Sequence, residues 1–334
     1  MDGLEREMDR LAAQTEFSGV VRVDRHGAVA LIKAYGLAHR GHKIANTVET
    51  QFALASGAKG FTALVVASLI EQGGLELATT ARSLLGTDLP LISDEVTVEH
   101  LLCHRSGIGD YLDEDIAGDI SDYPMTVPVH QLETTEAYLP ILGGRVAKFG
   151  SGQDFSYCNG GFVVLALLAE RASGMSFYEL VDQRVCRPAG LSSTAFLRSD
   201  ELDGRAAMGY LDASAARSNV LHLPVRGSGD GGIYSTATDI HALWDALLGG
   251  RIVSPRWVAE MTRSRSIVES ESMRYGLGFW LHRTTDAVML EGYDAGVSFR
   301  SVHQPTEKIT HTVISNTSSG AWPLTKFLDE FLEI

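Results

Sequence analysis

Positive charge is scarce in this sequence. Its 28 lysines and arginines are outnumbered by 42 aspartates and glutamates, which gives a formal net charge of −14 at pH 7. No cluster of basic residues interrupts this acidic excess, although binding to phosphate backbones or anionic lipid headgroups requires a basic patch. The composition therefore argues against nucleic acid and membranes as partners and favours a small-molecule or peptide ligand.

Cysteines and long apolar runs are also scarce. The three cysteines, Cys103, Cys158 and Cys186, are too few and too scattered for a disulfide framework, which fits a reducing compartment. The longest apolar runs, residues 61–70 and 162–169, have about half of the roughly 20 residues that cross a bilayer, so we expect core helices. The N-terminal segment is acidic and lacks the basic and apolar regions of a signal peptide. The sequence as given therefore predicts a cytoplasmic protein.

Regions of strand-like and helix-like pattern follow one another along the chain. β-rich runs flank a His26-Gly27 turn near the N-terminus, and further strand-like runs fill the C-terminal part. Between residues 56 and 203 the periodicity is helical. We therefore expect an α+β fold with the active site in a cleft between two units. These are an antiparallel sheet domain from both chain ends, residues 1–60 and 225–334, and an inserted, mostly helical subdomain, residues 61–224.

The run ALASGAKGF places Ser56 and Lys59 three residues apart at the start of an otherwise apolar helix. Positions i and i+3 of a helix share a face, so the Lys59 amine can reach the Ser56 hydroxyl. A serine becomes a nucleophile near neutral pH only beside a base, and a lysine with a pKa lowered by burial can be that base. The tetrad S-x-x-K is common, however, and a capping serine beside a solvent-directed lysine is the structural alternative.

A second pair of candidate residues, Tyr157 and Asn159, lies in the run SYCNGGF just before another apolar helix. Tyr157 can relay the serine proton if its pKa of about 10 is lowered by a neighbouring cation such as Lys59. Asn159 can hold a substrate carbonyl or the lysine amine. Taken alone, the pair also fits an ordinary loop tyrosine and a helix cap.

Three other patterns give weaker signals. The run GSGDGG at residues 227–232 has the spacing of a dinucleotide-binding loop but lacks the surrounding βαβ pattern. His100, Cys103 and His104 have helical spacing suited to a metal, but no further ligands accompany them, and we expect structural histidines and no metal or cofactor. The G-x-S-x-G elbow does not occur, which excludes the α/β-hydrolase arrangement of a nucleophilic serine.

These motifs resemble those of the penicillin-recognising serine enzymes, the serine β-lactamase and penicillin-binding-protein-like family. The closest branch is that of the class C β-lactamases, DD-peptidases and esterases. The resemblance spans nearly the whole chain, through FSGVVRVDRHG, AYGLAHRGHKIANTVETQFALASGAKGFTA, EVTVEHLLCHRSGI, SYCNGGF, PAGLSST, GDGGIYSTATDI and YGLGFW. It implies that Ser56 is the acylated nucleophile and Lys59 its partner in proton transfer. Tyr157 is then the general base and Asn159 the substrate-positioning amide. The implied oxyanion hole uses the backbone amides of Ser56 and of a strand residue after Tyr293.

The third motif of this family, Lys-Thr-Gly or His-x-Gly on a strand beside the nucleophile, is altered here. Tyr293, Asp294 and Ala295, followed by Gly296, stand at the matching place, and we assign these residues to substrate binding. In the family the basic residue helps to hold a substrate carboxylate and keeps the tyrosine pKa low, so its loss disfavours acyl-D-Ala and β-lactam substrates. The esterase branch tolerates an aromatic residue here, which implies a neutral or cationic ester or amide. The Ala295 methyl group is expected to narrow the gap beside the serine.

The residues and the resemblance together predict a serine hydrolase that forms an acyl-enzyme on a small ester or amide. An acyltransferase with the same chemistry is the first alternative. A ligand-binding protein without turnover is the second, and a DD-peptidase or β-lactamase proper is the third. The sequence leaves the natural substrate and the oligomeric state open.

Overall fold

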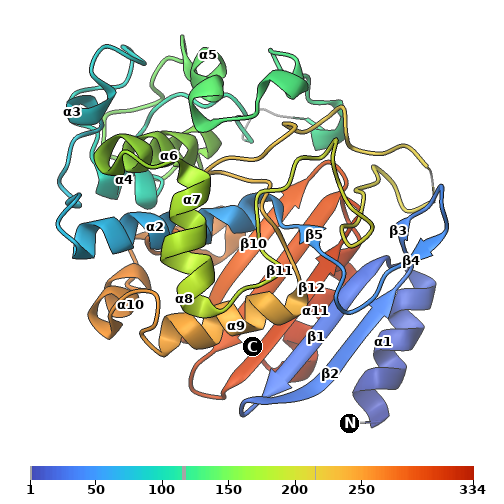
Figure 1. Ribbon diagram of the computed structural model, residues 1–334. Helices are drawn as coiled ribbons and strands as arrows, with labels where there is room; N and C mark the ends of the chain where they lie inside the picture. The colour runs from blue at the N-terminus through green and yellow to red at the C-terminus, as the bar shows by residue number, and fades with distance from the viewer. Residues whose placement is uncertain (1, 115–117, 215) are drawn as a thin grey trace.

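An eight-stranded antiparallel sheet forms the centre of the computed structural model, which describes residues 2–114, 118–214 and 216–334 (Figure 1). The strands lie in the order β2 (Ala28–Tyr35), β1 (Gly19–Arg25), β12 (Ile309–Ser315), β11 (Val297–Gln304), β10 (Val288–Asp294), β9 (Trp280–His282), β8 (Met273–Tyr275) and β7 (Ser266–Val268). N-terminal strands thus pair with C-terminal ones, which confirms the predicted α+β fold with a sheet from both chain ends.

The conformation of the turn between β1 and β2 is explained by its two central residues. His26 and Gly27 have φ angles of 52° and 77°. Positive φ at both central positions is what the favoured two-residue hairpin turn requires, because its twist then matches that of the strands. The predicted hairpin is therefore confirmed.

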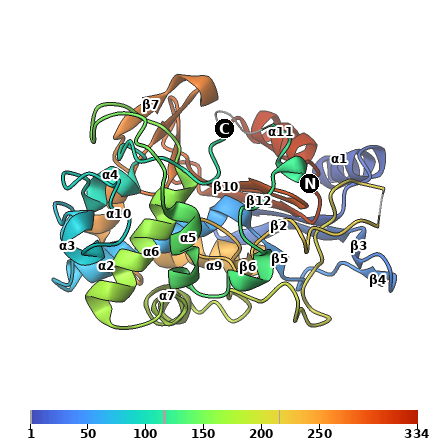
Figure 2. The same cartoon turned by 90° about the horizontal axis from the view of Figure 1, so that it is seen from above.

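Helices cover both faces of the sheet (Figure 1, Figure 2). On one face, α1 (Asp2–Gln14) and α11 (Ala321–Leu332) bury a small core that includes Met8, Val21 and Leu328. On the other face, α2 (Ala58–Glu71) and α9 (Ala237–Leu248) contribute to the main core, and α10 (Pro255–Met261) packs beside α9. The main core extends from the sheet into the helical region, so one hydrophobic interior joins the two.

The helical region between the two ends of the sheet centres on α6 (Asn159–Ser173), which packs against α2 and is buried from residue 159 to 169. Burial on all sides explains its continuous apolar sequence, and Gly174 ends it in the left-handed conformation. The other helical elements are α3 (Ala81–Leu85), α4 (Val98–Leu102), η2 (Ile120–Asp122), η3 (Val129–Gln131), η4 (Thr135–Tyr138), α5 (Leu139–Leu142), α7 (Phe177–Val181), η5 (Asp182–Cys186) and α8 (Arg187–Ala189).

Four short strands and one further turn complete the described chain. The strands form two pairs, β3 (Leu37–His39) with β4 (Ile44–Ala45) and β5 (Phe52–Ala53) with β6 (Tyr234–Ser235), and the turn is η6 (Glu269–Glu271). The domain boundaries at residues 60/61 and 224/225 stay a prediction. Helix α2 crosses the first of these boundaries, and it packs against α6 of the helical region.

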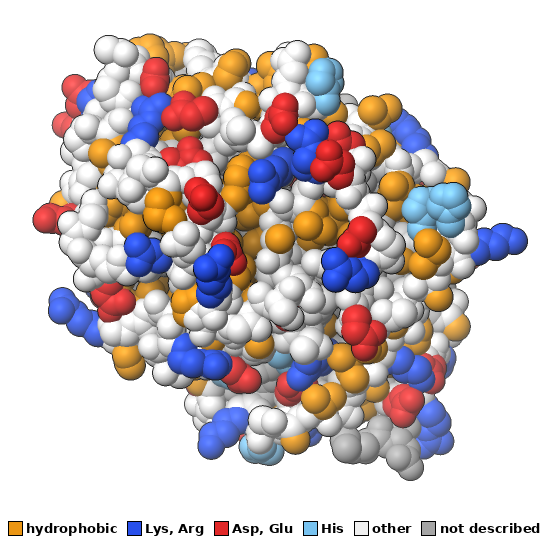
Figure 3. Space-filling view, viewed as in Figure 1, with side chains coloured by type: hydrophobic (Ala, Val, Ile, Leu, Met, Phe, Trp, Pro, Cys, Tyr) orange, Lys and Arg blue, Asp and Glu red, His pale blue; other side chains and the backbone are white. Residues whose placement is uncertain are grey.

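No single helix of the described ranges is long and apolar enough to cross a membrane, and α6 with residues 177–189 reaches that length only as a pair bent by 86°. All three cysteines are free and buried. On the face shown in Figure 3, acidic and basic side chains are interspersed, and no broad basic area is visible.

Candidate active site

Ser56 lies in a short turn, η1 (Ala55–Gly57), that runs directly into α2. Ala55 has a φ of 44°, a left-handed conformation that costs a residue other than glycine about 1–3 kcal/mol. A Cβ atom at Gly57 would lie 2.5 Å from the ring of Phe299, so only glycine fits there. The strained alanine and the closely packed glycine hold the serine at a sharp turn, where it lines the pocket described below.

The Lys59 side chain, which is 2% exposed, brings its Nζ atom among three acceptors. Nζ lies 2.8 Å from Ser56 Oγ, 2.7 Å from Asn159 Oδ1 and 2.9 Å from the carbonyl oxygen of Asp230. Burial lowers the pKa of Lys59, and four surrounding carboxylates, led by Asp230, oppose this shift. A lowered pKa increases the fraction of neutral amine, which is the form that can accept a proton from serine.

The Tyr157 ring centre lies 4.8 Å from Lys59 Nζ. Burial raises the pKa of Tyr157 well above its ordinary value, Glu114 adds to the rise, and the interaction with the Ser56 side chain opposes it only in part. A relay of the serine proton by Tyr157 required a pKa lowered by Lys59, and this condition is not met, because burial raises the pKa of Tyr157. A phenol with a raised pKa is protonated near neutral pH, so Tyr157 is suited to donate a proton and not to act as the general base that the resemblance implied.

Asn159 joins the nucleophile to the helical region. Its Oδ1 accepts the hydrogen bond from Lys59, and its Nδ2 donates to the Leu112 carbonyl at 3.0 Å and to Glu114 Oε1 at 2.9 Å. The carboxylate of Asp110 fixes the start of α6, since its oxygens accept from the N–H groups of Asn159 and Gly160 at 2.6 and 2.8 Å. The side-chain oxygen of Asn159 is therefore occupied by its hydrogen bond with the Lys59 amine.

Strand β10 borders the nucleophile turn, and Gly292 makes this approach possible. A Cβ atom at Gly292 would lie 2.0 Å from the Leu54 carbonyl oxygen and 3.0 Å from the Gly57 nitrogen. Ala295, by contrast, is 1% exposed in the β10–β11 turn, where its carbonyl accepts from Asn219 Nδ2 at 2.9 Å. The prediction that the Ala295 methyl group narrows the gap beside Ser56 was therefore wrong.

Of the four residues assigned to substrate binding from the third motif, two line the pocket and two do not. Tyr293 and Asp294 border it. Ala295 and Gly296 form the hairpin turn, in which Gly296 has a φ of 71° and donates its N–H to Ser318 Oγ at 2.8 Å. Their assignment to substrate binding is corrected, because the strand extends past the serine before it turns.

The pairing of β10 with β11 decides which amide of this strand faces the site. Asp294 and Val297 close the hairpin as a hydrogen-bonded pair, so the adjacent pair, Tyr293 and Ser298, is not hydrogen-bonded. The Tyr293 N–H therefore points away from β11, toward the edge of β10 that β9 leaves open. The N–H of Ala295 is taken by Asp294 Oδ1 at 2.9 Å. The available strand amide is thus that of Tyr293 itself and not of a later residue.

Gly292→Ala is expected to lower kcat/KM by about 100-fold and to reduce the melting temperature, because the new methyl group must displace the nucleophile turn from β10. Initial rates on an activated ester and thermal unfolding measure the two effects. Gly204→Ala is the matched control, since a Cβ atom there meets nothing within 4 Å. Wild-type kcat/KM in Gly292→Ala would show that this close approach is not needed.

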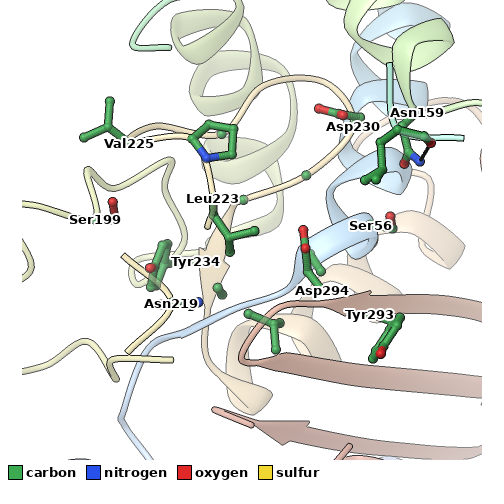
Figure 4. Close-up of a pocket in the computed structure, with 18 of the residues that line it drawn as sticks. Ser56, Asn159, Ser199, Asn219, Leu223, Val225, Asp230, Tyr234, Tyr293 and Asp294 are labelled. Atoms are coloured by element: carbon green, nitrogen blue, oxygen red, sulfur yellow. Dashed lines mark hydrogen bonds between the residues drawn. The ribbon is translucent and has the colours of Figure 1, made fainter. Parts of the chain in front are cut away.

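A pocket extends from Ser56 between the end of β10 and residues 197–199 and 219–234 (Figure 4). Three carboxylates line it, those of Glu114, Asp230 and Asp294. Apolar side chains also line it, namely Leu112, Leu197, Leu223, Pro224, Val225 and Val297. Burial raises the pKa of Asp294 to about 7, and repulsion from Asp230 and Glu114 adds to this rise. A second, more open hollow adjoins Ser56 and is lined by Tyr157, Trp280 and Trp322.

His104 is a site residue whose position the sequence did not reveal. Its ring packs on that of Tyr157 with a centroid distance of 4.3 Å and an interplanar angle of 33°. The Cys158 N–H donates to His104 Nδ1 at 3.0 Å, so the ring proton is on Nε2, which donates to the Tyr275 hydroxyl at 3.2 Å. Burial and the nearby Lys59 charge lower the pKa of His104 well below its ordinary value. The run HLLCH drew attention to His104 in the sequence, but we interpreted its histidines only as structural. No metal-binding cluster is found among the described residues.

Curated relatives of this chain include proteins of several kinds. Penicillin-binding protein 4* of Bacillus subtilis is 25% identical over 308 residues, which are 88% of this chain and 66% of that protein. Esterase EstB of Burkholderia gladioli is 27% identical over 83% of this chain and 77% of its own. A D-aminopeptidase of Brucella anthropi is 26% identical over 91% of this chain and 56% of its own. The chain spans 56–66% of the length of the first curated relatives it matches.

Solved structures similar to this chain include penicillin-binding proteins, as the curated relatives do. A penicillin binding protein from Bacillus halodurans superposes with a TM-score of 0.91 at 32% identity, over 97% of this chain and 99% of that one. A penicillin-binding protein homologue from Pyrococcus abyssi, described as octameric, gives a TM-score of 0.80 at 26% identity, over 96% and 74% of the two chains. The sequence model of the Beta-lactamase family matches residues 4–326. With a match over nearly its whole length, the chain belongs to the beta-lactamase family.

Proposed function

We propose that this protein is a serine hydrolase that forms an acyl-enzyme on a small ester or amide. The observation that carries the proposal is the 2.8 Å contact between Lys59 Nζ and Ser56 Oγ, made by a buried lysine whose pKa is lowered. A serine beside such an amine has the base that its activation requires. The esterase and D-aminopeptidase among the relatives support the same reaction class.

In the proposed acylation, neutral Lys59 takes the Ser56 hydroxyl proton while Oγ forms a bond to the substrate carbonyl carbon. The negative charge that develops on the carbonyl oxygen is stabilised by the backbone N–H groups of Ser56 and Tyr293. The phenol of Tyr157 gives its proton to the leaving oxygen or nitrogen as the carbon–heteroatom bond breaks, and the proton held by Lys59 restores it. Water then attacks the acyl-enzyme, and its proton returns to Ser56 Oγ as the acid leaves.

The charges around the site disfavour a carboxylate-bearing substrate. Strand β10 contains neither lysine nor histidine, and no described residue that lines the pocket is a lysine or arginine. Lys59 Nζ already lies within hydrogen-bond distance of three groups of the protein, Ser56 Oγ, Asn159 Oδ1 and the Asp230 carbonyl oxygen. A β-lactamase or DD-peptidase activity therefore has less support than hydrolysis of a neutral or cationic ester or amide.

Tyr157→Phe is expected to lower kcat by about 10²–10⁴-fold, because the phenol supplies the proton for the leaving group. The phenylalanine ring keeps the packing on His104 and on Trp280, whose ring lies 6.0 Å from that of Tyr157, so the melting temperature should change little. Steady-state rates and thermal unfolding test both statements. Tyr35→Phe, which removes a hydroxyl bonded to Asp9 on the far side of the sheet, is the control. A kcat of Tyr157→Phe within about threefold of wild type would contradict this role.

The direct test of the proposed function is the mass of the intact protein during reaction with p-nitrophenyl butyrate, with nitrophenol release followed in the same sample. A butyryl adduct that forms and then decays is the expected result. Addition of an alcohol or amine to the same reaction, with mass analysis of the products, separates hydrolysis from acyl transfer. Neither adduct nor release from a panel of activated esters and amides would contradict the proposal.

A further inference from the structure

The pocket beside Ser56 contains a carboxylate that the proposed chemistry does not use. Asp294, at the end of β10, accepts a hydrogen bond on Oδ1 from the N–H of Ala295 at 2.9 Å, and within the described residues no other donor to it is found. Figure 4 shows its side chain directed from the strand into the space between Ser56 and Asn219. One carboxylate oxygen of Asp294 therefore remains available to a ligand.

The carboxylates around this space outnumber the cation that acts on them, Lys59, which interacts with four carboxylates. Asp230, which is 7% exposed, accepts from the Tyr111 hydroxyl, and Glu114 accepts from Asn159 Nδ2. The Lys59 amine is held in contact with Ser56, Asn159 and the Asp230 carbonyl. The repulsion that helps to raise the pKa of Asp294 to about 7 is a consequence of this imbalance, and a cation entering the pocket would reverse it.

We propose that the Asp294 side of the pocket binds a protonated primary amine on the acyl part of the substrate, so that aminoacyl esters or amides are the preferred substrates. This inference rests on the function proposed above and specifies its substrate class.

The distances agree with an amine close to the reacting carbonyl. Gly292 abuts the nucleophile turn, and Asp294 comes two residues later on the same strand. The Cα atoms of these two residues are therefore about 7 Å apart. An α-ammonium nitrogen lies roughly 2.5 Å from the carbonyl carbon. Together with a hydrogen bond of about 2.8 Å and an attack distance of about 3 Å, this spans at most about 8 Å, which is enough to cover the strand distance of about 7 Å. Apolar residues that line the same pocket, including Leu223 and Val225, then contact the substrate side chain.

The test compares substrates that differ only in the amine. The p-nitroanilides of D- and L-phenylalanine are measured against 3-phenylpropanoyl p-nitroanilide, which lacks the amine, and against the N-succinyl derivatives, which are anionic. For one enantiomer, kcat/KM is expected to exceed that of the isostere without the amine by at least about tenfold, and the anionic derivatives should be the poorest.

Asp294→Asn is expected to lower this preference for the amine at least about tenfold, mainly through KM. Asparagine keeps the oxygen that accepts the Ala295 N–H, and thermal unfolding checks that the variant folds. Glu114→Gln, a second variant on the same pocket, should reduce the preference in the same direction by less. Asp94→Asn removes an equal charge at a side chain that is 84% exposed and should leave the preference unchanged.

The outcomes separate this inference from the proposed function. Equal rates for the aminoacyl compound and its isostere, unchanged by Asp294→Asn, would overturn the amine site while hydrolysis stands. If no anilide is hydrolysed, calorimetric titration of Ser56→Ala with phenylalaninamide and with 3-phenylpropanamide decides. Tighter binding of the amine that is lost in the Ser56→Ala, Asp294→Asn double variant supports the site, and equal binding overturns it.

Discussion

Ser56→Ala is expected to abolish the acyl adduct and to lower kcat by about 10⁵–10⁶-fold. Without Oγ no covalent intermediate forms, and the backbone amides with the pocket supply only the residual catalysis. Intact mass during reaction with p-nitrophenyl butyrate and the rate of nitrophenol release measure the effect.

The same variant should cost little stability. Lys59 Nζ loses one of its three acceptors, which corresponds to about 1 kcal/mol of hydrogen-bond energy, and Asn159 and Asp230 retain it. Ser83→Ala, on an exposed serine of α3 whose hydroxyl donates to the Thr80 carbonyl, is the control and should behave as wild type. A butyryl adduct that persists on Ser56→Ala would assign the nucleophile to another residue.

Lys59→Met is expected to lower kcat by about 10³–10⁴-fold, because methionine fills the buried space but cannot accept the serine proton. Steady-state rates on the activated ester measure this loss. Lys33→Met, which removes a surface lysine paired with Glu5 and Asp9, is the control for the loss of charge alone. A kcat of Lys59→Met within about tenfold of wild type would exclude Lys59 as the base.

Stability should respond to Lys59→Met in a pH-dependent way. The lysine charge lowers the pKa of both Asp230 and Asp294, so its removal raises them further. A carboxyl group whose pKa is higher in the folded than in the unfolded protein loses stability as the pH rises between the two values. Thermal unfolding of Lys59→Met should therefore show a steeper fall between about pH 4 and pH 8 than wild type shows. A slope equal to that of wild type would mean that these carboxylates do not interact with Lys59.

Local sequence was sufficient for the features that depend on near neighbours. The three-residue spacing of Ser56 and Lys59 places them on one helix face, and both prove to be in contact. The His26-Gly27 turn predicts its hairpin, and the continuous apolar run before Gly174 predicts the buried helix α6. The α+β fold with strands from both chain ends followed from the order of the strand-like and helical patterns.

Only the tertiary structure decided the features that depend on burial and on distant contacts. The resemblance placed the third motif at residues 293–295, but the glycine that abuts the nucleophile turn is Gly292. The position of the strand relative to this turn depends on tertiary contacts, which the motif does not specify. Likewise, the pKa of Tyr157 is raised because the side chain is buried. The spacing Y-x-N in the sequence does not show whether this tyrosine is buried.

The charge balance of the site also arises from the fold. Lys59 meets the Asp230 carbonyl from 171 positions away, and Asp294 and Glu114 reach the same pocket from the sheet and from the helical region. The sequence by itself therefore determined the reactive pair, Ser56 and Lys59, because helical spacing is a local property. The carboxylates that surround this pair, and with them the charge of the substrate it favours, were decided by long-range packing, which brings together groups that no local pattern connects.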